Sequence, residues 1–353
     1  MNIVSRLSHQ VQSPAYRLRY MRLASSPRNV ASRDEGTSRP GFCSGLRRLP
    51  TRLALSIGKL LLSGGLVGYL VYHYGLNHQQ LDRIDPIFGS TAMAIFVLQL
   101  ALATVRWRVL LRHLTGTNAS YRAMFGIYYA SAFFSQVLPS IGGDVTRVLY
   151  GRTLGSASVP IIISVLLDRG LAIAALLFLA LLSLVFLAPF DPGHVVLRSI
   201  GILAVGGLAT AYSGCLMARA MRGLRTWTAL PQWIRTLIAS CDWSLTSRTG
   251  LCFLIPLSAF VHLLSIAAIF LAARAVHVPL TPAMVLGIGP VLVLAQVLPI
   301  SVGGWGVREA AAVTLLAMTG IDATSALLVS IMFGILIFLA TLPGVLFWLT
   351  LRD

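Results

Sequence analysis

Two short motifs in this 353-residue chain combine a helix-breaking turn with an arginine. The first reads Gln-Val-Leu-Pro from Gln136 and continues through paired glycines to Arg147, and the second runs in the same way from Gln296 to Arg308. Proline removes a backbone N–H and glycine frees φ and ψ, so a helix is expected to break at each motif. A helix that restarts there presents unpaired N–H groups and its positive dipole end. Both features favour an anion, which arginine also binds.

Acidic residues accompany both arginines. A carboxylate there can cap the restarted helix, pair with the arginine, or hold it apart until a ligand arrives. Arg308 and Glu309 form the stronger half of the pattern, because the chain from His277 to Ile321 carries no other Asp, Glu, Lys or Arg, and charge within a membrane indicates function. The candidate substrate-binding residues are Gln136, Gly142, Gly143, Asp144, Arg147, Asp168, Arg169, Gln296, Gly303, Gly304, Arg308 and Glu309.

Each candidate also has a purely structural interpretation. Paired glycines permit close helix packing, and Asp144 with Arg147 has the i,i+3 spacing of a local ion pair that needs no ligand. Asp168 and Arg169 can equally mark the membrane interface. The glutamine of each motif more often hydrogen-bonds within a protein than to a ligand.

The elements that must hold these residues are membrane helices. Apolar residues make up 56% of the chain, charged residues 11%, and the mean hydropathy is +0.81, values that argue against a soluble protein. The four cysteines have no CxxC spacing or partner histidines, so neither a metal site nor a disulfide framework is expected. About 20 apolar residues cross the hydrocarbon layer, which predicts full spans at 53–72, 88–105, 160–187, 195–217, 251–273 and 323–349.

Arginine supplies nearly all of the positive charge behind the formal net charge of +17. Residues 1–52 contain ten arginines against two acidic residues and no long apolar run, which predicts a disordered basic arm. Other arginines cluster in 106–122 and 218–248, between apolar stretches, which is the pattern of cytoplasmic loops rather than of a nucleic-acid-binding protein. We therefore expect an inner-membrane protein whose N-terminus is cytoplasmic.

The loop charges also decide the path of the two interrupted stretches. The three basic regions can all be cytoplasmic only if the stretch from Ala123 turns back at its glycines, as a re-entrant hairpin or as one that crosses twice. The same count of membrane crossings places the second turn on the opposite side of the membrane from the first. The prediction is an all-α polytopic membrane protein with about six full spans and two broken, re-entrant helical hairpins. They form an inverted repeat of 88–187 and 251–349, joined by the span 195–217, within a transmembrane domain 53–353.

The two motifs resemble those of a known family. QVLPSIGGDVTR followed by SVLLDRG, and QVLPISVGGWGVREAA before a final long span, are similar to the flippase-like membrane domain of lysylphosphatidylglycerol synthases. The resemblance covers about residues 55–350 and implies translocation of a lipid, often anionic or modified, between leaflets. The synthases have a soluble aminoacyl-transferase domain after this part, whereas the present chain ends at Asp353, so we expect a stand-alone member that does not make the aminoacyl lipid. The positions that the resemblance carries over are Pro139, Gly142, Gly143, Asp144, Arg147, Asp168, Arg169, Gly303, Gly304, Arg308 and Glu309.

The function expected from these observations is lipid translocation, without catalytic residues, cofactor or metal. The expected partners are membrane lipids with an anionic head group, with a lipid-linked sugar and a hopanoid-pathway lipid among the candidates, and lipid-modifying enzymes as further candidates. A carrier for a small soluble anion, a non-transporting scaffold and a membrane transferase stay open as alternatives. The transferase is the weakest of these because the sequence has no DxD motif or acidic metal cluster, and the absence of a P-loop argues against direct ATP drive.

Overall fold

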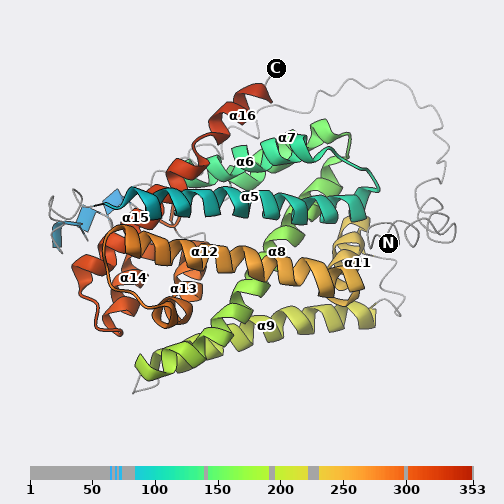
Figure 1. Cartoon of the computed structure of the whole chain (residues 1–353). Coiled ribbons are helices and arrows are strands. Elements are labelled where there is room, and N and C mark those ends of the chain that lie inside the picture. The colour runs from blue at the N-terminus through green and yellow to red at the C-terminus, as the bar shows by residue number, and fades with distance from the viewer. Residues whose placement is uncertain are drawn as a thin grey trace, which may run out of the picture. The chain divides into compact units, whose positions relative to one another are not determined.

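Helices supply nearly all of the regular secondary structure in the described residues of the computed structural model, which are 64–65, 68–69, 71–73, 84–138, 142–190, 195–221, 230–297 and 301–351 (Figure 1). The predicted arm 1–52 and most of the predicted first span lie outside them. The helices are α5 (Pro86–Thr115), α6 (Tyr121–Val137), α7 (Gly142–Gly151), α8 (Ser158–Leu187), α9 (Val195–Met221), α11 (Gln232–Thr246), α12 (Ile255–Ala275), α13 (Pro282–Val297), α14 (Val307–Ala317), α15 (Ala323–Thr341) and α16 (Gly344–Thr350).

Helices α5 and α12 lie side by side and run in opposite directions (Figure 1). The backbone N–H of Asp85, the N-cap of α5, donates to the carbonyl of Ala275 at the end of α12 over 2.8 Å. At its other end, α5 stops at Gly116, whose φ of 69° is favourable only for glycine. Between these caps, α5 has 30 residues and a length of about 45 Å. The helix therefore continues for ten residues beyond the predicted end of the span at residue 105, because the chain has no helix-breaking residue there.

Two hairpins leave this helix pair from opposite ends. The first, α6 with α7, follows the end of α5, and the second, α13 with α14, follows the end of α12. Since α5 and α12 are antiparallel, the hairpins begin at opposite ends of the pair and their turns approach each other. A Cβ added to Gly303 in the second turn would lie 3.2 Å from the carbonyl oxygen of Gln136 in the first. Both motifs thus interrupt a helix, and the described residues Gln136 and Gly303 of the two motifs lie close together.

The paired glycines act differently in the two turns. Gly142 and Gly143 form the start of α7 without positive φ, and a Cβ on Gly143 would overlap the hydroxyl of Ser135 and the carbonyl of Ser131. The first pair therefore allows α7 to pack closely on α6. Gly303 and Gly304 instead have φ of 59° and 81°, so the second pair provides a backbone conformation that side chains with a Cβ rarely adopt.

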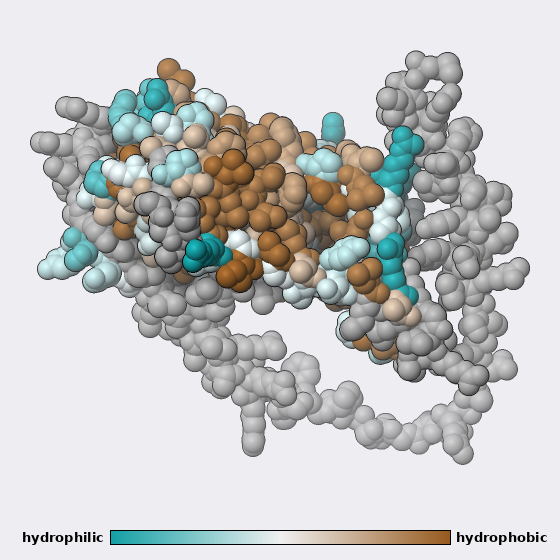
Figure 2. All heavy atoms as spheres, turned by 90° about the horizontal axis from the view of Figure 1, so that it is seen from below, coloured by the Kyte–Doolittle hydropathy of each residue, from teal (hydrophilic) through white to brown (hydrophobic). Residues whose placement is uncertain are grey.

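Four helical segments of the described part are long and apolar enough to cross a membrane: 86–115, 158–187, 250–275 and 323–350, the last of which contains both α15 and α16. Apolar side chains cover the middle of the surface that Figure 2 shows, with hydrophilic residues toward both ends. Large apolar residues are strongly exposed in the described part, among them Val185 and Ile202, which are each 75% exposed. Such a band is expected where lipid tails replace water. The chain is an all-α, multi-pass membrane protein.

The last predicted span is not a continuous helix. Helix α15 ends at Thr341 and α16 begins at Gly344, with Pro343 between them. Proline lacks the N–H that would continue the helical hydrogen bonds, so the helix is interrupted there. Helix α16 packs against α6. A Cβ on Gly344 would overlap the carbonyl of Tyr129 on α6, so the contact between the two helices is close.

The basic stretch 218–248 is largely helical rather than a loop. Helix α9 extends to Met221, and α11 covers Gln232–Thr246. Trp243 of α11 stacks on His113 near the end of α5, with ring centroids 3.6 Å apart, which attaches α11 to the helix pair. Trp233 on the same helix has about half of its surface exposed (52%), as expected of a tryptophan at a membrane interface.

Candidate functional site

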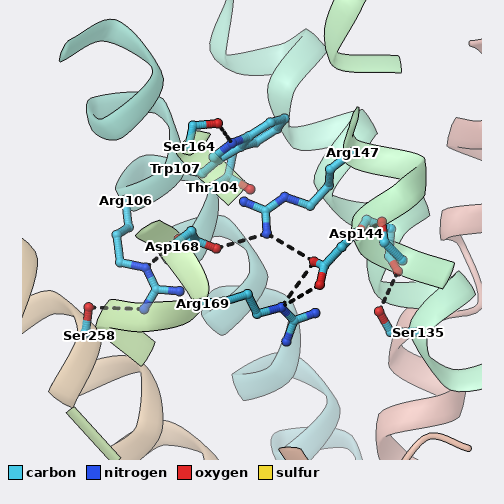
Figure 3. A network of polar contacts seen from close by, with 12 residues as sticks. Thr104, Arg106, Trp107, Ser135, Asp144, Arg147, Ser164, Asp168, Arg169 and Ser258 are labelled. Atoms are coloured by element: carbon cyan, nitrogen blue, oxygen red, sulfur yellow. Dashed lines mark hydrogen bonds and ion pairs between the residues drawn. The ribbon is translucent and has the colours of Figure 1, made fainter. Parts of the chain in front are cut away.

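Asp168 is the centre of a buried network that joins four helices (Figure 3). Its Oδ1 accepts a hydrogen bond of 2.7 Å from Nε of Arg106 on α5, and its Oδ2 accepts one of 3.0 Å from Nη1 of Arg147 on α7. Nη1 of Arg106 also donates to the hydroxyl of Ser258 on α12 over 3.1 Å. All three ionised groups are at most 3% exposed. Charges at this depth are stable only with such partners.

The guanidinium of Arg147 lies against two aromatic rings. Its Cζ is 4.5 Å from the ring centroid of Trp107 and 4.6 Å from that of Tyr128. Trp107 is itself fixed by its Nε1, which donates to the hydroxyl of Ser164 on α8 over 2.9 Å. The rings set the orientation of the guanidinium, while its Nε and Nη2 are buried without a hydrogen-bond partner. Arg147 therefore has donors available for a ligand.

Asp144, one turn before Arg147, pairs mainly with another arginine. Nε of Arg169 on α8 lies 3.1 Å and 3.0 Å from its two carboxylate oxygens, whereas the Arg147–Asp144 distance is 3.8 Å. The network of Arg106, Arg147 and Arg169 with Asp144 and Asp168 thus has three positive and two negative charges. Both carboxylates are engaged, and one net positive charge is left.

The arginine of the second motif is also buried beneath aromatic rings. Cζ of Arg308 lies 4.8 Å from the ring centroid of Trp305 and 5.6 Å from that of Phe333. Nε of Arg308 donates to Oε1 of the neighbouring Glu309 over 3.0 Å and to the hydroxyl of Ser330 on α15 over 3.2 Å. This pair is electrically neutral.

Glu309 also fixes the start of α14. Its Oε2 accepts a hydrogen bond of 2.5 Å from the backbone N–H of Gly306, the residue before the helix. One Glu309 carboxylate thereby binds both its own helix terminus and Arg308. Gly334 on α15 leaves the space for this arrangement, because a Cβ there would overlap the guanidinium of Arg308.

A cavity of about 250 Å³ extends between the turns of the two hairpins and the Asp168 network. Helices α5, α6, α7, α8, α12, α13 and α15 contribute to its wall. Of the residues predicted from the sequence, Arg308, Glu309, Asp144, Gly142 and Gly143 do not line it. Those that do are Gln136, Arg147, Asp168, Arg169, Gln296, Gly303 and Gly304. The structure therefore brings the first motif, the Asp168–Arg169 pair and the second turn to one cavity, and places the Arg308–Glu309 pair outside its wall.

Comparison with protein families shows the family to which the chain belongs. The model of the lysylphosphatidylglycerol synthase TM region matches residues 56–344. The chain belongs to this family. Comparisons with curated proteins and with solved structures gave no match. Within the described residues of this family member, no three His, Cys, Asp or Glu side chains are grouped in a way that could hold a metal ion.

In this lysylphosphatidylglycerol synthase TM region, Arg106 belongs to the site although it was not among the residues predicted from the sequence. Its charge indicated a cytoplasmic loop after a span that ends near residue 105, yet the side chain is buried inside α5. A signal was present, because no glycine or proline occurs between Val105 and Gly116 to end the helix. Sequence spacing gave no corresponding indication for Tyr128 or His262, which reach the cavity from α6 and α12.

Proposed function

We propose that this family member is a lipid translocator that binds an anionic head group in the cavity between the two hairpin turns. The observation that carries the proposal is Arg147, a fully buried cation on the cavity wall with two N–H-bearing nitrogens that have no protein partner. An unpartnered charged donor at this depth is costly unless a ligand satisfies it for part of the time. The acyl chains would stay in the bilayer while the head group passes through the protein.

The arrangement of the hairpins supports movement rather than static binding. Each hairpin is preceded by one long helix and followed by another, with α5 and α8 around the first and α12 and α15 around the second. We infer an inverted repeat whose halves rock against each other and expose the cavity first to one leaflet and then to the other, as in transporters with broken helices at the midplane. In this scheme, the neutral Arg308–Glu309 pair holds the second turn in shape.

We further propose that the protein lies in the inner membrane with its N-terminus in the cytoplasm. The support is the positive charge of residues 1–52 and of the segments that contain Arg112 and Arg235. In this orientation, α11 lies at the cytoplasmic surface. We propose no catalytic role for the chain, so its action is the transfer of a lipid between leaflets without a chemical change.

A leaflet-resolved assay in proteoliposomes tests the proposed function. The protein is reconstituted with a trace of head-group-labelled anionic lipid, and the fraction accessible to a membrane-impermeant quencher is followed with time. Replacing Arg147 by Gln removes the two free donors, and Asp168 keeps Arg106 as its partner. A hydrogen bond to a charged group contributes about 1.5–3 kcal/mol, so the variant should flip the lipid at least roughly tenfold more slowly.

Arg152→Gln is the matched control for this experiment. Arg152 lies just beyond the end of α7, is exposed, and does not line the cavity. It removes the same charge from the same part of the chain and should leave the rate unchanged. Equal flipping by wild type and the Arg147 variant would contradict the proposal. Uptake of labelled soluble anions without any lipid flipping would instead identify a carrier for a small soluble anion.

A further inference from the structure

Five buried polar side chains around the cavity have an atom without a protein partner. One of them, Arg147, offers donors and a positive charge. The other four are neutral and also line the cavity. Three of them are Gln99, Gln136 and Ser301, whose unpartnered atoms are Oε1, Oε1 and Oγ. Amide carbonyl oxygens are acceptors only, and a serine hydroxyl both donates and accepts. This part of the wall therefore has acceptor atoms that a ligand could satisfy with its own hydrogen-bond donors.

His262 on α12 is the fourth neutral group. Its Nε2 is 3.0 Å from the carbonyl oxygen of Ala172, which can only accept, so Nε2 carries the proton. In the neutral ring, Nδ1 is then an acceptor, and this atom is buried without a partner. Together with the two glutamines, His262 gives the cavity three unsatisfied acceptors and, beside them, the hydroxyl of Ser301.

The charges of the cavity wall are not balanced. Both carboxylates of the network, Asp144 and Asp168, are already bound by arginines, and Glu309 outside the wall is bound by Arg308. The net charge of the network is +1, as counted above. A ligand with one negative charge neutralises it, whereas an ammonium group would enter a site of like charge without a free carboxylate to pair with.

We propose that the cavity takes a singly anionic phosphate diester whose substituent carries hydroxyl groups, and that it rejects head groups that carry an ammonium group. The phosphate binds the free Nε and Nη2 of Arg147, and the hydroxyl groups donate to Gln99, Gln136 and His262. This inference rests on the proposed function and narrows its substrate. The inference excludes as a ligand the lysylated lipid after which the family is named, because the ammonium groups of that lipid have no free carboxylate to pair with in the cavity.

Binding and translocation are measured separately to test the inference. Purified full-length protein in phosphatidylcholine nanodiscs is titrated with three lipids: phosphatidylglycerol, which has the charge and the hydroxyls; phosphatidylmethanol, which has the same charge without hydroxyls; and lysylphosphatidylglycerol, which has ammonium groups. We expect phosphatidylglycerol to bind at least about tenfold more tightly than each of the others, the factor that corresponds to about 1.4 kcal/mol. Equal binding of phosphatidylmethanol overturns the role of the hydroxyls, and equal or tighter binding of lysylphosphatidylglycerol overturns the rejection of ammonium.

Gln136→Glu provides a gain-of-function test. The substitution keeps the shape of the side chain and adds a carboxylate beside the second turn, without touching the arginine network. It should weaken the binding of phosphatidylglycerol and strengthen that of lysylphosphatidylglycerol, so that the ratio of the two affinities falls by about tenfold. Asp322→Asn, on the exposed N-cap of α15 away from the cavity, is the control and should leave the ratio unchanged. An unchanged ratio in the Gln136 variant overturns the proposal.

The same lipids are then followed in the leaflet-resolved assay. Selective binding without flipping supports the proposed ligand and contradicts the proposed function. Flipping of all three lipids at equal rates supports the function and overturns the ligand class. Soluble glycerophosphoglycerol is included as a competitor, because it is a singly anionic phosphate diester with hydroxyl groups and has no acyl chains. Competition at concentrations similar to those of the lipid identifies a soluble ligand and overturns the assignment to a lipid.

Discussion

One carboxylate oxygen of Asp168 lies 3.0 Å from Nη1 of Arg147, and this contact joins α8 to the second helix of the first hairpin. The other oxygen holds Arg106 on α5. A single carboxylate therefore connects the hairpin to the helix pair on which it rests. Because Nε and Nη2 of Arg147 have no hydrogen-bond partner and the residue lines the cavity, the same contact that positions the hairpin also holds the side chain that carries these donors.

Asp168→Asn should strongly destabilise the protein. The substitution removes the carboxylate that pairs with Arg106 and with Arg147, and it leaves both buried arginines without this partner. Breaking a buried ion pair in this way costs about 3–5 kcal/mol, which should appear as a large fall in the thermal unfolding temperature in detergent. The charge-balanced double variant Arg106→Gln with Asp168→Asn should recover part of this loss. A double variant no more stable than the single one would show that the destabilisation has another cause than charge.

Gly143→Ala should weaken the first hairpin. A Cβ there would overlap the hydroxyl of Ser135 and the backbone carbonyl of Ser131, and the backbone atom cannot move aside without separating α7 from α6. Overpacking of this kind costs about 1–3 kcal/mol. Gly170→Ala on α8 is the matched control, because a Cβ at Gly170 would meet nothing within 4 Å. Thermal unfolding of the two variants should separate them clearly, and equal stabilities would argue against close packing at the first turn.

The sequence predicted the interruptions of both hairpins and the helical, membrane-spanning class, because hydrophobic length and helix-breaking residues are local properties. It could not predict which carboxylate each arginine meets. Asp144 and Arg147 have the spacing of a pair, yet Arg147 lies closer to Asp168, which is 21 residues away and on another helix. The choice depends on how α7 packs against α8, and that packing is set by contacts between distant segments.

The role of charge was harder to predict than its presence. Arg106 indicated the end of a span because arginine is rare in hydrocarbon, but a paired arginine can be buried, and α5 continues past it. Likewise, the isolated Arg308–Glu309 pair looked like the stronger half of the site, while the structure packs it against Trp305, Phe333 and Ser330, and neither charged residue lines the cavity. An uncharged sequence neighbourhood does not distinguish a ligand site from an internal ion pair.

Glu309→Gln should lower stability without changing which lipid the cavity prefers. The carboxylate binds Arg308 and also accepts from the N–H of Gly306, so its loss leaves a buried cation and weakens the start of α14. We expect a destabilisation of about 3 kcal/mol or more. The affinity ratio between phosphatidylglycerol and lysylphosphatidylglycerol, measured on the folded fraction, should equal that of wild type. A changed ratio would place the Arg308–Glu309 pair in the binding site.

Asp322, which lies outside the membrane-spanning helices, makes a pH-dependent contribution to the stability of the folded state. It is the N-cap of α15, and the backbone N–H of Ser325 donates to its carboxylate over 2.9 Å, which lowers the pKa of Asp322 below its ordinary value. A lowered carboxyl pKa stabilises the folded state above the unfolded pKa, about 3.9, and this contribution is lost as the pH falls through the folded value. Asp322→Ala should therefore cost about 1 kcal/mol near neutral pH and progressively less in acid, as measured by thermal unfolding at pH 7 and pH 3. Asp322→Asn keeps a capping oxygen and should lose less at pH 7, and a cost for Asp322→Ala that stays constant between the two pH values would contradict the assignment to the carboxylate.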